Sequence, residues 1–279
     1  MVNPLYAFGI LDWIWDLIAL LVTFVVFFAL IRLTIYLQRR KKIPSAVTPY
    51  VFQIFGGPLF LVCWLLYSGV FFSRYMAAIV PAFLILYSIL IVFFNRQDEG
   101  FVESMAYEGD KYNLLTGPFF YLIIMVFAVF YLWYVPIDLN GTPLFTNFIP
   151  TAILILGPLS GGAAVANLVT ERYSKRTFRI LAKKSVEGTL AMFCLSLLTT
   201  VGILGVYWIV LEPAFASINI TFLILPIIVT TIIATIVELL SPRHVDIILI
   251  PIIVFITIAI LSVIGLYPYW LLYPFRPPF

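Results

Sequence analysis

The stretch KKSVEGTLAMF, from Lys183 to Phe193, places two lysines, a serine and a glutamate directly before an apolar run that is long enough to cross a bilayer. About 20 residues of helix span the hydrocarbon core of a membrane. Short polar joints followed by apolar runs of this length recur along the whole chain. The sequence therefore predicts an all-α, polytopic integral membrane protein.

Composition and spacing give the number of helices. Of the 279 residues, 63% are hydrophobic and 10% are charged, with a mean hydropathy of +1.13, whereas a soluble domain carries about 25% charged residues. No linker or soluble insertion divides the chain, so we expect a single membrane domain, 1–279. The apolar runs predict about eight transmembrane helices, near 15–37, 50–68, 76–94, 117–136, 147–168, 187–210, 219–240 and 246–267.

The basic residues predict the orientation, because Lys and Arg are retained on the cytoplasmic side. With Arg39 inside, eight alternating spans place nearly all of the 16 basic residues inside and both termini outside. Asp12 and Asp16 precede the first run, where a signal peptide would carry basic residues, so we expect this run to remain as a helix. Most acidic residues also fall beside the internal joints. We therefore expect a site facing the cytoplasm, in the cell membrane or the endoplasmic reticulum.

The sequence favours neither a zinc or disulfide framework nor binding to nucleic acid. Cys63 and Cys194 both lie inside apolar runs, where they are most simply small buried hydrophobes, and no zinc or disulfide spacing occurs. The pI near 8.8 mostly reflects the internal basic residues, so nucleic acid is not an expected partner.

The segment YSKRTFRILAKK, Tyr173 to Lys184, has five basic residues and no acidic one, which makes it a candidate cradle for a polyphosphate. Sorting of basic residues to the inside would by itself also explain this charge. We expect Lys183 and Lys184 to act as exposed phosphate contacts, through charge and not through packing. The basic residues are Lys175, Arg176, Arg179, Lys183 and Lys184.

Acidic residues stand at the inner ends of the last three spans. Glu187 falls in the first turn of the sixth span, where the helix dipole favours an anion, and Ser185 is a plausible N-cap. Glu238 and Asp246 flank the turn at Ser241, where two facing carboxylates can share a divalent cation. The alternative is that Glu238 pairs with Arg243 or with a lysine from another loop. The single histidine, His244, is more typical of a surface or capping residue.

These residues, taken together, resemble the membrane family of CTP-dependent lipid-alcohol kinases, which includes dolichol kinase, phytol kinase and the yeast-type diacylglycerol kinase and is related to phosphatidate cytidylyltransferases. The likeness is strongest over 157–252. It rests on GGAAVANLVTERYSKR, KKSVEGT and ATIVELLSPRHVDIILIP. The resemblance assigns Lys184, Ser185, Glu187 and Gly188 to the nucleotide and metal region, and Glu238 and Asp246 to its last motif.

The chain departs from the family at several positions. The acidic residue after Gly162 is replaced by Ala163, a later glycine by Thr170, and the residue after Asp246 is Ile247. The stretch PYVFQIFGG, 49–57, stands where the family has a basic pair and a histidine. Asn167 lies one helical turn after Ala163, so it could replace the lost acid as a neutral oxygen ligand.

The resemblance implies a kinase that moves the terminal phosphoryl of CTP to a polyprenol- or dolichol-like alcohol, or to another lipid alcohol. Lys184, Glu187 and Asp246 would be catalytic, the basic segment with Ser185, Gly188 and Asn167 would bind the nucleotide, and Glu187, Glu238 and Asp246 would hold Mg²⁺. We expect Lys184, Glu187, Glu238 and Asp246 to line one cavity. The alternatives are cytidylyl transfer to a lipid phosphate, as in CDP-lipid synthesis, and a catalytically silent lipid-binding relative.

Overall fold

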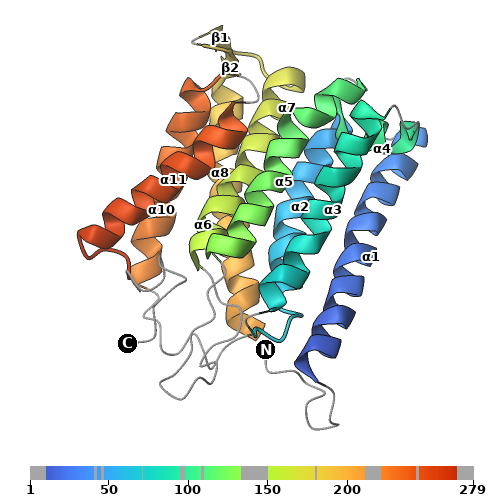
Figure 1. Cartoon of the computed structure of the whole chain (residues 1–279). Helices are drawn as coiled ribbons and strands as arrows, with labels where there is room; N and C mark the ends of the chain where they lie inside the picture. The colour runs from blue at the N-terminus through green and yellow to red at the C-terminus, as the bar shows by residue number, and fades with distance from the viewer. Residues whose placement is uncertain are drawn as a thin grey trace.

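The computed structural model describes residues 11–40, 43–44, 47–70, 72–94, 98–107, 110–132, 150–179, 181–210, 221–242 and 245–268. The described chain forms a bundle of helices that carries one small β-hairpin at one end (Figure 1). The first half contains α1 (Asp12–Arg39), α2 (Thr48–Trp64), α3 (Ser73–Phe93), α4 (Glu99–Met105), the 3₁₀ turn η4 (Lys111–Leu115), α5 (Gly117–Phe127) and the π-helical η5 (Ala128–Leu132). The second half contains α6 (Pro150–Gly157), the π-helical η6 (Pro158–Ala163), α7 (Ala164–Arg172), β1 (Thr177–Arg179), β2 (Lys183–Ser185), α8 (Val186–Val210), α10 (Thr221–Leu240) and α11 (Asp246–Val263).

Within the described residues, seven helical segments are long and apolar enough to cross a membrane, which confirms the all-α, polytopic prediction. The second predicted span, 50–68, forms the shorter helix α2, which has 17 residues and ends at Trp64. After Trp64 the chain forms turns. The Ser68 N–H donates to the Asp16 carboxylate and not to a helical carbonyl, so the helix ends earlier than predicted. The described residues therefore contain seven full-length spans, one fewer than the eight predicted from the sequence.

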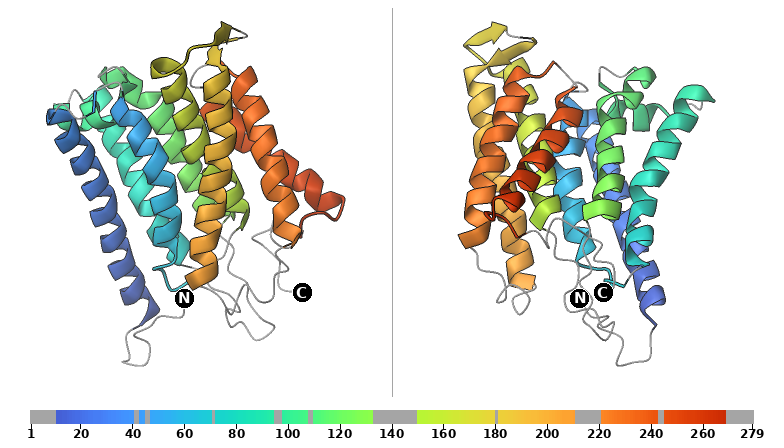
Figure 2. Two further views of the ribbon diagram at one scale, coloured as in Figure 1. Left: turned by 180° about the vertical axis from the view of Figure 1, so that it is seen from behind. Right: turned by 60° about the vertical axis from the view of Figure 1, so that its left-hand side comes forward.

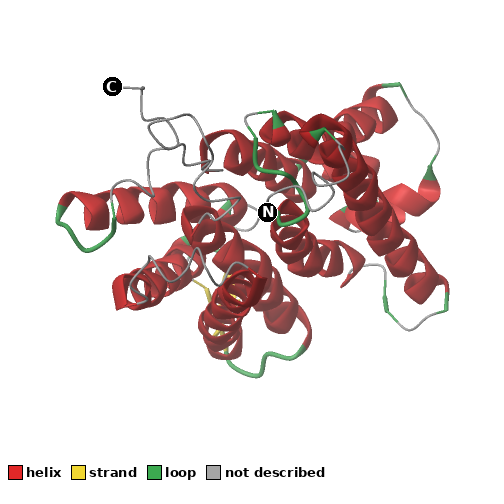
Figure 3. Cartoon of the chain, turned by 90° about the horizontal axis from the view of Figure 1, so that it is seen from below, coloured by secondary structure: helices red, strands yellow, loops and turns green. Residues whose placement is uncertain are grey.

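The central element of the bundle is the continuous span α6–η6–α7. In the apolar 18-residue window of this span, 78% is buried inside the protein. This share is larger than in the corresponding window of any other long span that the structure describes. Figure 2 shows α1 at one edge of the bundle and α10 and α11 at the opposite edge. Figure 3 shows the same helices from below, seen nearly end-on. Because the central span is enclosed by protein, it can carry polar side chains that lipid would exclude.

Small residues allow the central span and α8 to approach closely, as GPLSGGAAVANLV predicts. A Cβ atom added at Gly161 would lie 3.1 Å from the Leu195 carbonyl oxygen, and one at Gly162 would lie 3.1 Å from the Met192 carbonyl oxygen. Both contacts are with backbone of α8, which cannot move aside as a side chain can. These glycines therefore set the spacing between η6 and α8.

The polar joints predicted for the cytoplasmic side meet at one end of the bundle. The β-hairpin, α4 and the turn between α10 and α11 all lie at the upper end in Figure 1. These elements share one end because successive spans cross the bundle in opposite directions. That this end faces the cytoplasm remains a prediction from the basic residues.

A buried carboxylate fastens the opposite end. Asp16 of α1 is 1% exposed and accepts hydrogen bonds from the Ser68 amide at 2.7 Å and from the Ser73 hydroxyl at 2.6 Å. Trp15 donates its indole N–H to the Leu66 carbonyl at 2.6 Å. These bonds hold the turn between α2 and α3 against α1, so Asp16 stabilises the fold at this end.

Replacing Asp16 by alanine should lower the stability of the protein, because a buried donor left without its acceptor costs about 1–3 kcal/mol. Asp12→Ala is the matched control, since Asp12 is only half-buried in the first turn of the same helix. The measurement is the thermal unfolding temperature in detergent. Equal unfolding temperatures for the two variants would contradict the role assigned to Asp16.

Candidate functional site

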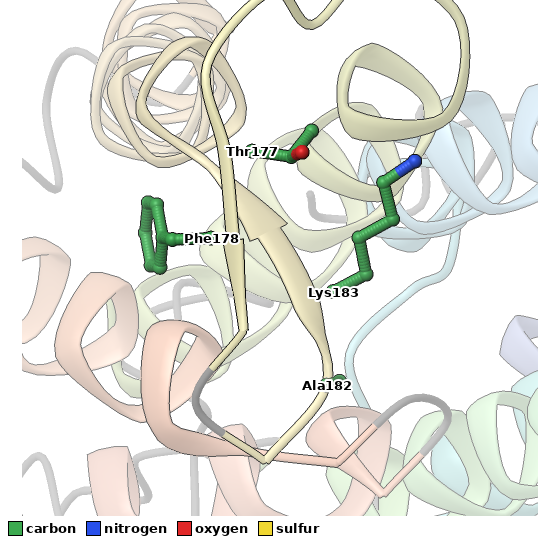
Figure 4. Close-up of a pocket in the computed structure, with 4 residues that line it drawn as sticks. All are labelled: Thr177, Phe178, Ala182 and Lys183. Atoms are coloured by element: carbon green, nitrogen blue, oxygen red, sulfur yellow. The ribbon is translucent and has the colours of Figure 1, made fainter.

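The β-hairpin separates its two adjacent lysines. Phe178 pairs with Lys184 and Arg179 with Lys183 in an antiparallel register. Successive side chains of a strand point to opposite faces, and Figure 4 shows Phe178 and Lys183 on opposite sides of the hairpin. Lys184 is accordingly buried at 2% exposure, whereas Lys183 is exposed. Of the two lysines that were expected to be exposed, only Lys183 is exposed, and its contact with phosphate remains a prediction.

Lys184 reaches from β2 into the helical bundle and forms an ion pair with Glu238 of α10. The two side chains are 3% and 2% exposed. The alternative that Glu238 pairs with a lysine from another loop is thus the arrangement that the structure shows. Removing one partner of a buried pair leaves an uncompensated charge and costs several kcal/mol. We therefore expect Lys184 to stabilise the fold in addition to supplying a positive charge.

Asp246 lies beside this ion pair, at the start of α11, and is fully buried. Its Oδ2 atom accepts a hydrogen bond from the Asn167 amide at 3.0 Å, and its Oδ1 atom accepts one from the Ile247 N–H at 3.0 Å. Its charge also acts on Glu238. We call the buried Lys184, Glu238 and Asp246, together with the half-buried Asn167, the buried polar cluster. Its members come from β2, α10, α11 and α7.

Glu187 is directed elsewhere. Its carboxylate accepts a hydrogen bond from the Lys175 N–H at 3.4 Å and interacts with the Arg176 N–H. It therefore ties the segment before β1 to the first turn of α8. Among the described residues, no three His, Cys, Asp or Glu side chains gather closely enough to hold a metal ion. The expected trio of Glu187, Glu238 and Asp246 is thus not assembled in this structure, and Glu238 with Asp246 remain the candidate pair.

The residues retained around KKSVEGT shape the start of α8. Ser185 accepts a hydrogen bond from the Gly188 N–H at 2.9 Å, which confirms the predicted N-cap. The Ser185 and Thr170 hydroxyl groups are also 2.9 Å apart. A Cβ atom at Gly188 would lie 2.9 Å from the Ala166 carbonyl oxygen and would also strike the Thr170 hydroxyl. Gly188 therefore allows α7 and α8 to touch.

The exposed basic residues surround the hairpin. Lys175, Arg176 and Lys183 are all exposed. A pocket of about 420 Å³ is lined by Thr177, Phe178, Ala182 and Lys183 (Figure 4). The side chain of Arg179 and the residues Arg243 and His244 lie outside the described part of the chain. The surface thus offers at least three ammonium or guanidinium groups to an anion.

The positions that depart from the family pattern are used for packing. Ala163 is 2% exposed and Ile247 is 4% exposed, and both belong to the apolar core. Ala163 therefore faces the inside of the bundle and not lipid, as expected from its place one turn before Asn167.

A second polar group, which the sequence did not single out, lies between α2, α4 and α7. Gln53 donates to the Tyr107 hydroxyl at 2.7 Å, and Tyr50 donates to Glu171 at 3.0 Å. A Cβ atom at Gly117 would lie 3.0 Å from the Tyr107 oxygen and 2.9 Å from Ile247 Cδ1, so this group adjoins the start of α11. An amide inside an apolar span, as at Gln53, is the signal that could have indicated it.

Comparisons with known proteins give relatives whose names are consistent with this site. No protein-family model and no solved structure matches the chain. The chain is 30% identical to "Probable phytol kinase, chloroplastic" of Zea mays over 169 residues, which is 60% of this chain and 50% of the relative. It is 23% identical to "Phytol kinase 1, chloroplastic" of Arabidopsis thaliana over 171 residues, 61% and 52% of the two chains, and 28% identical to "Farnesol kinase, chloroplastic" of the same plant over 145 residues, 52% and 43%. The chain spans about half the length of the curated relatives it matches. These relatives, by their names, support the resemblance to lipid-alcohol kinases.

Replacing Gly188 by alanine should destabilise the protein, because overpacking typically costs about 1–3 kcal/mol. Gly202→Ala, on the same helix, is the matched control, since a Cβ atom there meets nothing within 4 Å. Ala at Gly202 should be neutral or raise the unfolding temperature through helix propensity. If both variants unfold at the wild-type temperature, the close contact between α7 and α8 is not formed in solution.

Proposed function

We propose that this protein is a membrane kinase that transfers the terminal phosphoryl group of CTP to the hydroxyl of an isoprenoid-type lipid alcohol. The observation that carries the proposal is the reach of Lys184 from the exposed basic hairpin to the buried carboxylate of Glu238. It places cationic groups suited to a polyphosphate next to carboxylates suited to a divalent cation. The phytol and farnesol kinases that the chain resembles support phosphoryl transfer as the reaction.

The triphosphate is assigned to the hairpin side of the site. Lys175, Arg176 and Lys183 are exposed there, and Arg179 completes the proposed set. Each charge-assisted hydrogen bond to phosphate contributes about 1.5–3 kcal/mol. Glu187 orders the segment that carries Lys175 and Arg176, while Ser185 and Gly188 hold β2 against α8.

The donor atoms of the buried cluster fit a nucleotide-bound Mg²⁺, which typically takes one or two protein carboxylates and keeps several waters. Glu238 and Asp246 would hold it, and Asn167 fixes the Asp246 carboxylate. Bound there, the cation would supply charge neutralisation for the phosphate oxygens.

The proposed reaction balances without a further reactant. The alcohol oxygen forms a bond to the γ-phosphorus while the bond from that phosphorus to the bridging oxygen breaks, which gives CDP, a lipid monophosphate and the hydroxyl proton. Because the transition state of phosphoryl transfer is loose, catalysis depends on positioning and charge more than on a strong base. Lys184 and Asp246 are the groups proposed to act at the reacting phosphate.

The acceptor is proposed to enter from the membrane between helices. The relatives are named for phytol and farnesol, which are isoprenoid alcohols, and a longer dolichol-like alcohol is the second candidate. A site facing the cytoplasm, in the cell membrane or the endoplasmic reticulum, remains part of the proposal.

Two alternative functions remain open to the same test. Cytidylyl transfer to a lipid phosphate needs the same triphosphate recognition but attack at a different phosphorus. A catalytically silent lipid-binding relative is favoured by the apolar residues Ala163 and Ile247, both of which lie in the core.

Labelled CTP separates these functions. The purified protein should move label from the γ position, and not from the α position, into phytol or farnesol added in detergent. ATP labelled at the γ position tests the choice of CTP. Transfer of α label into an added lipid phosphate would establish cytidylyl transfer. No transfer of either label, to the lipid alcohols or to the lipid phosphate, would support the silent relative.

Ala163→Asp should increase activity if Glu238 and Asp246 hold a cation, because the added carboxylate faces the inside of the bundle one turn before Asn167. An additional 1 kcal/mol of cation binding would lower the half-saturating Mg²⁺ concentration about fivefold. Ala163→Asn is the matched control, because it adds nearly the same volume without charge. The readout is the Mg²⁺ dependence of transfer; the same dependence in both variants would argue against a cation at this site.

A further inference from the structure

We propose that Lys184 is a resident cation of the buried polar cluster, which holds Glu238 until a divalent cation replaces it and thereby frees Lys184 for the nucleotide. This inference rests on the proposed function. Cation binding and the transfer of Lys184 from carboxylate to phosphate would then be one exchange.

The charges of the cluster favour such an exchange. Lys184, Glu238 and Asp246 are all 2% exposed or less, so water contributes little to their solvation. The cluster holds two carboxylates, and the one ammonium group pairs with Glu238 alone, although a buried charge is costly unless it is compensated. A divalent cation would balance both carboxylates, whereas Lys184 balances only one. The resident lysine is therefore a partial substitute for a better-matched ion.

The two carboxylates are held by different partners. Asp246 is fixed by the Asn167 amide and by the Ile247 N–H, and neither bond involves Lys184. Departure of Lys184 would therefore leave Asp246 in place as a ready ligand. Glu238 accepts from Lys184 itself and is the carboxylate released for a cation.

Lys184 is carried by a small element at the end of the bundle. It lies on β2, one strand of a hairpin with three residues in each strand, which projects from the end of the helical bundle (Figure 1). Its ammonium group is carried by a flexible four-carbon stem. The exposed Lys183 is its neighbour in the chain but points to the opposite face of β2. A displaced Lys184 would therefore leave the inner face of the strand to join the basic groups proposed to hold the triphosphate.

The exchange has a thermodynamic consequence. A nucleotide that binds the freed Lys184 would favour the cation-bound state, and the cation would favour the nucleotide by the same factor. The site would then resist an isolated divalent cation but accept it together with a polyphosphate.

The test uses Mn²⁺ as the probe, without nucleotide, on the full chain in detergent. Free Mn²⁺ is measured by electron paramagnetic resonance and stability by thermal unfolding. Lys184→Met should bind Mn²⁺ at least about tenfold more tightly than wild type, and Mn²⁺ should raise its unfolding temperature more. Lys183→Met, which alters the exposed neighbour, should bind Mn²⁺ as wild type does. Lys184→Met combined with Glu238→Gln should lose the gain.

Equal or weaker Mn²⁺ binding by Lys184→Met would overturn the exchange. A measurement on the wild-type protein covers the case in which this variant does not fold. Mn²⁺ with a non-hydrolysable CTP analogue should increase hydrogen exchange at the backbone amides of 183–185 if Lys184 leaves Glu238, and unchanged exchange despite bound Mn²⁺ would contradict the proposal.

Failure of the exchange and failure of the kinase remain distinguishable. Tighter Mn²⁺ binding by Lys184→Met without phosphoryl transfer by the wild type would leave the exchange intact and reject the kinase. Transfer by the wild type with unchanged Mn²⁺ binding in the variant would do the reverse.

Discussion

The arrangement of the polar end depends on one buried ion pair, between Lys184 and Glu238. A buried charge in a membrane bundle is costly without a partner, and the position of the β-hairpin lets Lys184 reach α10. Beside the pair, Asn167 donates a hydrogen bond to Asp246. Together the ion pair and this hydrogen bond connect the ends of α7, α10 and α11. The same pair that fixes the hairpin also neutralises one of the two carboxylates that we propose as cation ligands, so the proposed site and the stability of the fold depend on the same groups.

Close packing of small residues makes this meeting possible. Gly161 and Gly162 bring the central span against α8, and Gly188 brings α7 against the first turn of α8. Ser185 caps that turn and contacts Thr170. The start of α8 is therefore fixed in position, and β2, which leads directly into it, carries Lys184 to Glu238. In this way residues of the KKSVEGT stretch that resemble a nucleotide motif also support its geometry.

The proposed site lies at the end of the bundle that carries the hairpin, which holds both the exposed basic residues and the buried carboxylates. The relatives named as phytol and farnesol kinases are consistent with the phosphoryl transfer that we propose for this site. The apolar residues Ala163 and Ile247 reduce the number of oxygen ligands and strengthen the core instead. The polar group of Gln53 and Tyr107 adjoins the start of α11, so both halves of the chain contribute to this end.

The sequence by itself determined the membrane bundle, the clustering of polar joints at one end and the N-cap at Ser185, because these depend on hydropathy, charge sorting and local hydrogen bonds. Only the tertiary structure decided that α2 ends at Trp64, where Asp16 captures the following turn. It alone separated Lys183 from Lys184, since the basic segment forms strands whose alternation a short charged stretch does not reveal. Glu187 likewise turns to the Lys175 amide and not to Glu238. Lys184 and Glu238 are 54 residues apart in the chain, and a pairing over that distance is set by how helices pack, which local sequence does not encode.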